Sequence, residues 1–97
     1  MQAKMLEGKV AIVSGASYGM GKSMAELFAS EGAKVVLTAR GKEKMDAVVD
    51  DLKGKGYDVT GVVADNKNLE DVKNVIQTAL DVYGDLDIVI NNAAIES

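Results

Sequence analysis

The sequence predicts an α/β domain with a doubly wound parallel sheet whose strands lie in the order 3-2-1-4. Three observations lead to this prediction. Short apolar runs alternate with segments of helical periodicity, the connections are short, and no linker interrupts the 97 residues. Parallel strands need crossover connections, which are right-handed, and helices then cover both faces of the sheet. We therefore expect one domain over residues 1–97, with the first two helices on one face and the third on the other.

Four apolar runs are expected to form the strands. Residues 9–14 (KVAIVS) are almost continuously apolar, which is typical of a strand covered on both faces. The second strand is predicted over residues 34–39 (KVVLTA). The third is predicted over residues 58–64 (DVTGVVA), where the internal Gly61 weakens the strand pattern. Residues 87–90 (DIVI) are expected to form the fourth.

Three helices are expected between these strands, because apolar residues there recur at helical spacing. Gly32 and Gly84 stand where the first and third helices should end, and Asn68 with Asp71 resembles a helix cap followed by an acidic third position. The apolar faces are predicted to consist of Met20, Met24, Leu27 and Phe28 in the first helix; Met45, Val48, Val49 and Leu52 in the second; and Leu69, Val72, Val75, Ile76, Ala79, Leu80 and Tyr83 in the third.

Composition excludes several classes of function. The net charge of −4 and the lack of a basic run argue against nucleic-acid binding. No apolar stretch approaches the ~20 residues that span a bilayer, so no membrane partner is expected. The absence of Cys and His excludes disulfides, the usual zinc sites and a His-based catalytic triad. The first ten residues lack a hydrophobic signal core, and we expect a cytoplasmic protein.

Three glycines join the first strand to the first helix, within the stretch SGASYGMG. Gly15 is expected to make the exit from the strand, Gly19 to let a phosphate approach, and Gly21 to let the helix pack against the strand. Backbone N–H groups at the positive end of a helix bind anions, so this turn predicts a pyrophosphate site. The alternative is a simple glycine-rich turn, because the spacing G-x-x-x-G-x-G differs from G-x-G-x-x-G.

The glycine spacing resembles that of the short-chain dehydrogenases/reductases, whose motif is T-G-x-x-x-G-x-G, with Ser14 here in place of Thr. The stretch VVAD ending at Asp65 resembles the acidic position at the end of the third strand of that family. DIVINNAAI resembles the N-N-A-G motif, with Ala94 in place of Gly. The resemblance covers nearly the whole chain. It implies a Rossmann-type fold, a nicotinamide dinucleotide cofactor, and an oxidoreductase that transfers hydride between the cofactor and an alcohol or ketone.

The candidate cofactor-binding residues are Gly15, Ser17, Tyr18, Gly19, Met20, Gly21, Arg40, Asp65, Asn66, Asn92 and Ala94. By the resemblance, those of the glycine turn line the adenosine and pyrophosphate. Asp65 and Asn66 hold the adenine edge by side chain and backbone respectively. Asn92 and Ala94 lie under the ribose. Two alternatives stay open: Asp65 as an ordinary cap of the strand end, and Asn91 or Asn92 as an amide tying the fourth strand to its neighbours.

The end of the second strand indicates the form of the cofactor. Ala39 occupies the position where NAD-binding members of this family have an acidic residue, and Arg40 follows it. Without a carboxylate nothing repels a 2′-phosphate, and a guanidinium pairs with one, so NADP(H) is favoured over NAD(H). Lys42 could add positive charge. The alternative is a solvated Arg40, and Tyr18 stands where many NADP-preferring relatives have Arg or Lys.

The family's catalytic Ser, Tyr and Lys would lie beyond the fourth strand. Tyr18 and Lys22 have the Tyr-x-x-x-Lys spacing but belong to the phosphate turn, so no catalytic residue is assigned. We expect either the cofactor-binding portion of an oxidoreductase, truncated after the fourth strand, or a stand-alone or engineered nucleotide-binding half-domain. In both cases residues 87–90 form an apolar edge strand, which we expect to pair with another copy or with a missing C-terminal half.

Overall fold

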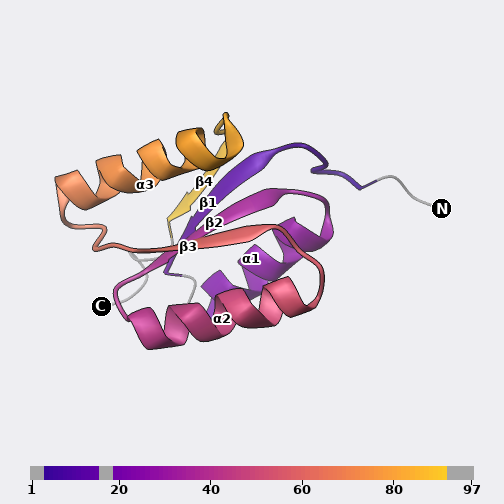
Figure 1. Ribbon diagram of the computed structural model, residues 1–97, viewed down its shortest axis with the longest axis horizontal. Coiled ribbons are helices and arrows are strands. Elements are labelled where there is room, and N and C mark those ends of the chain that lie inside the picture. The colour runs from indigo at the N-terminus through magenta and orange to yellow at the C-terminus, as the bar shows by residue number, and fades with distance from the viewer. Residues whose placement is uncertain (1–3, 16–18, 92–97) are drawn as a thin grey trace.

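The computed structural model describes residues 4–15 and 19–91, which fold into a parallel sheet between two layers of helices (Figure 1). Strands and helices alternate along the chain as predicted. They are β1 (Val10–Ser14), α1 (Gly19–Ser30), β2 (Lys34–Ala39), α2 (Lys42–Gly54), β3 (Val59–Val63), α3 (Leu69–Tyr83) and β4 (Ile88–Asn91). Within the described ranges, no helix has the length and apolar character needed to cross a membrane.

The sheet confirms the predicted strand order. Its order is β3-β2-β1-β4, and all three pairings are parallel. In register, Ser14 at the end of β1 lies beside Thr38 of β2 on one side and Asn91 of β4 on the other. From β1 the chain passes to β2 and β3 on one side of β1, and it then crosses to β4 on the other side of β1. Doubly wound sheets form a ligand crevice where the strand order reverses in this way.

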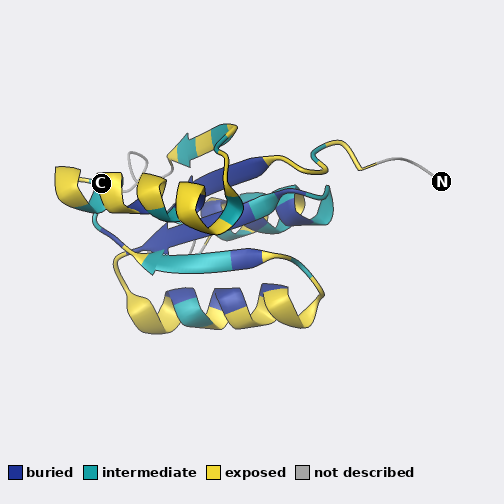
Figure 2. Cartoon of the chain, turned by 45° about the horizontal axis from the view of Figure 1, so that its top comes forward, coloured by how far each residue is buried: buried dark blue, intermediate teal, exposed yellow. Residues whose placement is uncertain are grey.

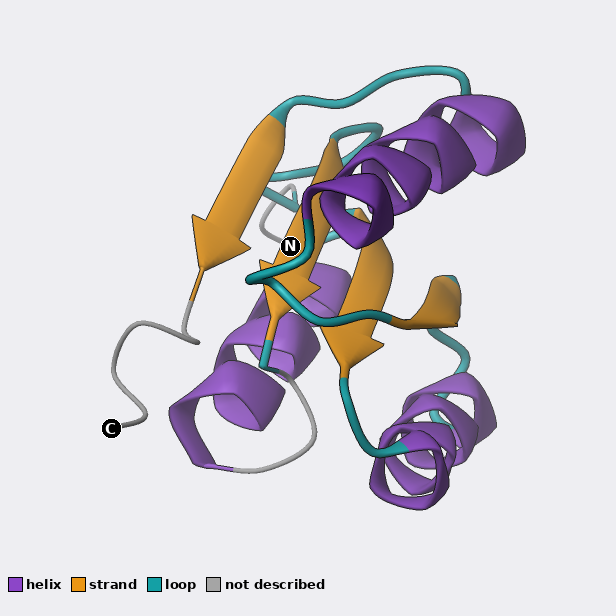
Figure 3. Cartoon of the chain, turned by 90° about the vertical axis from the view of Figure 1, so that its left-hand side faces the viewer, coloured by secondary structure: helices purple, strands orange, loops and turns teal. Residues whose placement is uncertain are grey.

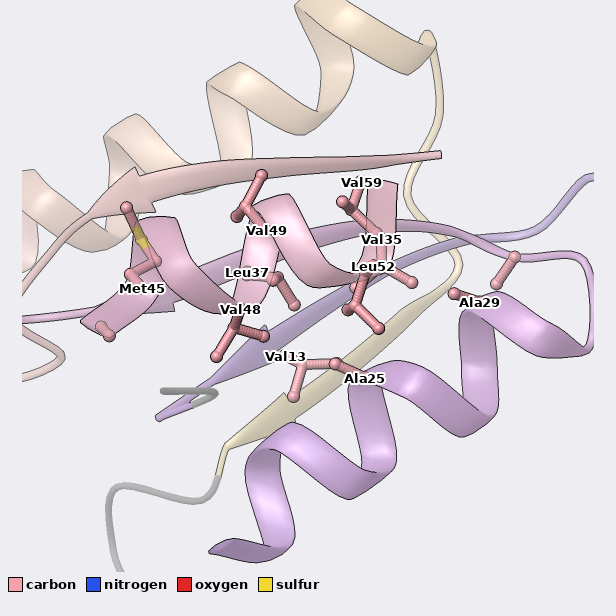
Figure 4. Packing of buried hydrophobic residues seen from close by; sticks show 12 residues of the cluster. Val13, Ala25, Ala29, Val35, Leu37, Met45, Val48, Val49, Leu52 and Val59 are labelled. Atoms are coloured by element: carbon pink, nitrogen blue, oxygen red, sulfur yellow. The ribbon is translucent and has the colours of Figure 1, made fainter. Parts of the chain in front are cut away.

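The core lies in two layers, one on each face of the sheet. On one face, α1 and α2 pack against Val13, Val35 and Leu37 (Figure 4). On the other, α3 packs against Val10, Ile12 and Val36. The odd and even positions of β1 therefore face opposite helix layers, as expected for a strand covered on both sides. This confirms that the first two helices share one face.

Gly61 has a packing role that its strand pattern alone does not show. A Cβ atom built at this position would lie 2.9 Å from Val49 Cγ2 and 3.1 Å from Met45 Cε. The glycine therefore lets α2 approach β3 closely. The four apolar positions predicted for this helix are all buried, which confirms its predicted face.

The predicted apolar face of α1 is confirmed only in part, because Phe28 packs, partly buried, against the core whereas Met20 and Leu27 do not. Met20 and Leu27 are 64% and 56% exposed, and the helix instead buries Gly21, Ala25 and Ala29. Small residues spaced four apart let the helix lie close to the strands beneath it, and larger side chains at these positions would hold it away. Burial of Gly21 agrees with the predicted close packing of this helix.

Only part of the predicted apolar face of α3 is covered. Val75 and Ala79 are buried against the sheet, whereas Ile76 and Leu80 are 37% and 43% exposed. Val89 of the neighbouring β4 is 59% exposed, and Figure 2 shows exposed residues along much of α3 and on β4. The sheet face beside β4 thus presents apolar side chains to solvent.

Tyr83 fastens α3 to the amino end of β3. Its hydroxyl donates to Asp58 Oδ1 at 3.0 Å and accepts from the Thr60 hydroxyl at 2.9 Å. Burial raises the pKa of Tyr83 to about 12. Because the folded state holds the phenol proton more tightly, this contribution to stability is complete below the unfolded pKa of about 10 and is lost as pH rises toward 12.

Tyr83→Phe is expected to lower the free energy of unfolding at pH 7 by about 1 kcal/mol, because both hydroxyl hydrogen bonds are lost. It should also reduce the loss of stability between about pH 10 and pH 12. Urea unfolding at neutral and alkaline pH measures both effects, with Tyr57→Phe as control, since Tyr57 is the other half-buried tyrosine among the described residues. An unchanged alkaline loss in Tyr83→Phe would contradict the assignment.

Candidate functional site

The strands are parallel, so their carboxyl ends lie at one edge of the sheet (Figure 3), and the described candidate residues lie at or after these ends. The chain leaves β1 at Gly15, whose N–H donates to the Thr38 carbonyl at 2.9 Å. It leaves β3 at Ala64, whose N–H donates to the Ala39 carbonyl at 3.0 Å. These backbone bonds hold the exits from three neighbouring strands at one level, so the loops that follow share one side of the molecule.

The glycine turn opens α1 with backbone geometry that requires glycine. Gly15 has φ +72° and Gly19, the first residue of α1, has φ +62°. A Cβ built on Gly19 would meet no atom within 4 Å among the described residues, so a side chain at this position would have room there. The first turn of α1 has no acidic residue, and the exposed Met20 follows Gly19. The predicted sites Ser17 and Tyr18 lie outside the described residues.

Asp65 caps the turn after β3, and one of its carboxylate oxygens performs this role. Oδ1 accepts from the Lys67 N–H at 2.9 Å. The Asp65 N–H donates to Asp71 Oδ2 at 2.9 Å, while Asn68 caps α3 by accepting from the N–H groups of Glu70 and Asp71. The capping interpretation of Asp65 is therefore confirmed. Its second oxygen has no hydrogen-bond partner among the described residues, and so remains able to accept from a ligand.

Asn66 links this turn to the opposite side of the sheet. Its side-chain Nδ2 donates to Asn91 Oδ1 at 3.0 Å. This bond confirms that one amide of the N-N pair ties β4 to a neighbouring segment. The Asn66 backbone N–H has no partner among the described residues. Asn92 and Ala94, the sites predicted to lie under the ribose, fall outside the described part of the chain.

Arg40 is exposed at the end of β2, directly after the buried Ala39. Its guanidinium forms no hydrogen bond or ion pair with another residue of the described ranges. Lys42 differs, because its ammonium pairs with Asp46 one helical turn away. The hydrogen bond to Asp46, with the attraction of the opposite charge, raises the pKa of Lys42. Arg40 is therefore a cation at this edge that is able to turn toward an added anion.

A tyrosine and a lysine do lie together, but at the wrong edge. Lys34 Nζ is 5.8 Å from the centre of the Tyr83 ring, at the amino ends of β2 and β3. The raised pKa of Tyr83 is opposite to what a general acid–base tyrosine needs near neutral pH. This pair is therefore structural.

Sequence reasoning missed a small cavity between α3 and the sheet. Its volume is about 100 Å³. The lining residues are Ile12, Ser14, Asn66, Val72, Val75, Ile76, Val89 and Asn91. The walls are mostly apolar, and the Asn66–Asn91 pair lies at its polar end. Its walls come from β1, β4, α3 and the turn after β3, which the sheet order brings together.

Several known proteins resemble this chain in sequence or in structure. Residues 9–97 match the family model described as short chain dehydrogenase. The chain is 41% identical over 93 residues to an uncharacterized oxidoreductase of Thermotoga maritima, covering 96% of this chain and 36% of the relative. The structure resembles a hydroxysteroid dehydrogenase from Escherichia coli with a TM-score of 0.87 and 30% identity, over 92% of this chain and 37% of that one.

A further solved structure, of a variant of actinorhodin polyketide ketoreductase with NADPH, matches with a TM-score of 0.84 and 28% identity, over 87% of this chain and 32% of that one. The chain therefore spans about a third of the length of these relatives. The match to the family model covers most residues of this chain, from before the glycine turn to the N-N-A-A stretch. The chain belongs to the short-chain dehydrogenase family.

Proposed function

We propose that this chain is the NADP(H)-binding portion of a short-chain oxidoreductase that acts on an alcohol or ketone. One observation carries the proposal. Among the described residues, the carboxyl edge carries an open Cβ position at Gly19, a backbone N–H of Asn66 and a carboxylate oxygen of Asp65 without hydrogen-bond partners, and the exposed guanidinium of Arg40. The bound nicotinamide would supply the hydride, and the residues here would bind and orient the adenosine half of the cofactor.

The turn after β3 suits the edge of an adenine base. The second carboxylate oxygen of Asp65 would accept from the 6-amino group, and the backbone N–H of Asn66 would donate to ring nitrogen N1. The two groups belong to adjacent residues, and the first carboxylate oxygen is already fixed by Lys67. An acceptor beside a donor in a held turn matches the donor and acceptor of adenine and opposes the reverse pattern.

The open terminus of α1 suits the phosphates. Its N–H groups and the helix dipole favour an anion there, and no described side chain occupies the space beside Gly19. Arg40 stands at the end of the strand next to β1, where a 2′-phosphate on the adenosine ribose would be reached. The small, buried Ala39 offers no carboxylate to repel that phosphate. These features support NADP(H) over NAD(H).

The chain is expected to bind 2′,5′-ADP more tightly than AMP, and Arg40→Ala should narrow this difference by roughly 1–3 kcal/mol, or about 5- to 150-fold. Ala39→Asp should shift preference toward AMP, because its carboxylate repels the 2′-phosphate. Titration calorimetry measures both. Lys42→Ala is the matched control, since that cation already pairs with Asp46. Equal affinities of the unsubstituted chain for the two nucleotides would refute the preference for NADP(H).

We also propose that the exposed apolar residues Ile76, Leu80 and Val89, called here the α3–β4 surface, form an interaction surface. Ile76 and Val89 line the same cavity, and Leu80 lies one helical turn beyond Ile76. In the described sheet, β4 is an outer strand paired with β1 alone. Outer strands and apolar patches of this kind pair readily with other chains. The occupant would be a second copy or the region that corresponds to the remainder of the longer relatives.

A further inference from the structure

The hydrogen bond between Asn66 and Asn91 joins two segments that the sheet order keeps apart. β3 and β4 are the two outer strands, with β2 and β1 between them. The turn after β3 must cross the sheet edge to reach α3, which packs over β1 and β2. At the far side of this crossing, Asn66 Nδ2 meets Asn91 Oδ1 at 3.0 Å. The bond thus ties the turn to the end of β4.

The same bond relates the turn to the glycine loop. Asn91 lies in register beside Ser14, and Gly15 leaves β1 at the next residue. The turn itself is fixed on its other sides, because the Asp65 N–H donates to Asp71 and the Ala64 N–H donates to Ala39. The amide pair adds the link toward β4, and so sets where the Asp65 carboxylate and the Asn66 N–H stand relative to the phosphate end of the site.

We infer that Asn91 and the Asn66 side chain are positioning residues for base recognition. Through their bond they hold the Asp65–Asn66 donor and acceptor in line with an adenine whose phosphate rests at the glycine turn. This inference rests on the proposed function. Because Asn91 is exposed and Asn66 partly so, water competes for the bond, and its loss should displace the turn without unfolding it.

Discrimination between AMP and IMP tests this role. Hypoxanthine has an N–H at N1 and an oxygen at C6, which reverses the donor and acceptor of adenine. The unsubstituted chain should therefore prefer AMP. Asn66→Ala keeps the backbone N–H but removes the amide, and should lower AMP affinity by about 2- to 10-fold while changing IMP affinity less. If the substitution only disturbed the structure, the affinities for AMP and IMP would fall equally and the ratio of the two affinities would not change.

Matched variants separate the bond from its surroundings. Asn91→Asp keeps an oxygen that can accept from Asn66 and should keep the preference for AMP, whereas Asn91→Leu should reduce it. Asn91 takes part in a further interaction, so Asn66→Ala is the primary variant. Asn74→Ala, at an exposed position of α3, controls for the loss of an asparagine. Binding is measured by calorimetry, and circular dichroism checks that each variant folds.

The outcomes distinguish this inference from the proposed function. If the unsubstituted chain binds neither nucleotide, or binds AMP and IMP equally, the proposed reading of adenine fails. If it prefers AMP and Asn66→Ala keeps the same AMP to IMP ratio, the positioning role alone is overturned. A reduced ratio in Asn66→Ala and in Asn91→Leu, with the ratio kept in Asn91→Asp, supports it.

Discussion

Gly19→Ala is expected to lower affinity for 2′,5′-ADP on the order of 100-fold, because the site would lose close phosphate contacts with the backbone. The space in front of Gly19 is open among the described residues, so a methyl group there meets no protein atom. It would instead occupy the position from which a phosphate contacts the terminus of α1. The effect should therefore be on binding far more than on packing. Titration calorimetry measures the loss.

Backbone strain needs its own control, because Gly19 has φ +62°. Gly84 at the end of α3 has φ +79°, and a Cβ there also meets no atom within 4 Å. Alanine at either position should cost about 1–2 kcal/mol of stability, as expected for a left-handed residue with a side chain. Only Gly19→Ala should lose nucleotide binding. Alanine is preferred to valine, since a β-branched residue is more strained at positive φ.

Equal nucleotide affinity in Gly19→Ala and the unsubstituted chain would exclude the phosphate role of the turn. Equal loss in Gly84→Ala would show that binding follows overall stability instead. Urea unfolding of both variants supplies the stability that this comparison needs.

The order of the elements could be predicted because each strand of a parallel sheet is apolar and each connection is short. The face of α1 could be predicted only in part, since Phe28 packs against the core but Met20 and Leu27 are exposed. Its sequence offers a stripe with Met20 and Leu27 and another with Ala25 and Ala29, both at helical spacing. Helical periodicity identifies apolar stripes but does not decide which stripe is buried. That choice depends on how closely α1 must approach β1, and the whole fold sets this distance.

The candidate site, too, could be predicted from the sequence only in part. The sequence places Asp65 and Asn66 at the end of a strand, and the glycines at the start of a helix. Asp65 Oδ1 accepts from the Lys67 N–H, whereas the other carboxylate oxygen has no hydrogen-bond partner among the described residues. Which oxygen takes which role depends on the side-chain torsions of Asp65. The bond from Asn66 to Asn91 joins residues 25 positions apart, and it exists because the sheet order brings their segments to one edge. From the sequence alone, a bond between an amide of the N-N pair and a neighbouring segment could be stated only as one of the open alternatives.

The isolated chain is expected to self-associate at micromolar concentration through the α3–β4 surface. Ile76, Leu80 and Val89 are each more than a third exposed, and β4 has one strand neighbour in the described sheet. Burying apolar area gains about 25 cal/mol per Å², so covering these side chains and pairing the strand edge favours a dimer.

Charge on this surface should oppose association. Leu80→Lys and Val89→Lys place ammonium groups where apolar contact would form, and desolvating them is costly, so both variants should sediment closer to monomer. Leu27→Lys is the matched control, because Leu27 is 56% exposed on α1, across the sheet from α3. If Leu27→Lys alone disrupts association, the contact lies on the other helix layer. Sedimentation equilibrium decides between these results, and a monomer at all concentrations up to tens of micromolar would refute self-association, because the exposed surface would then be stable in water without a second copy.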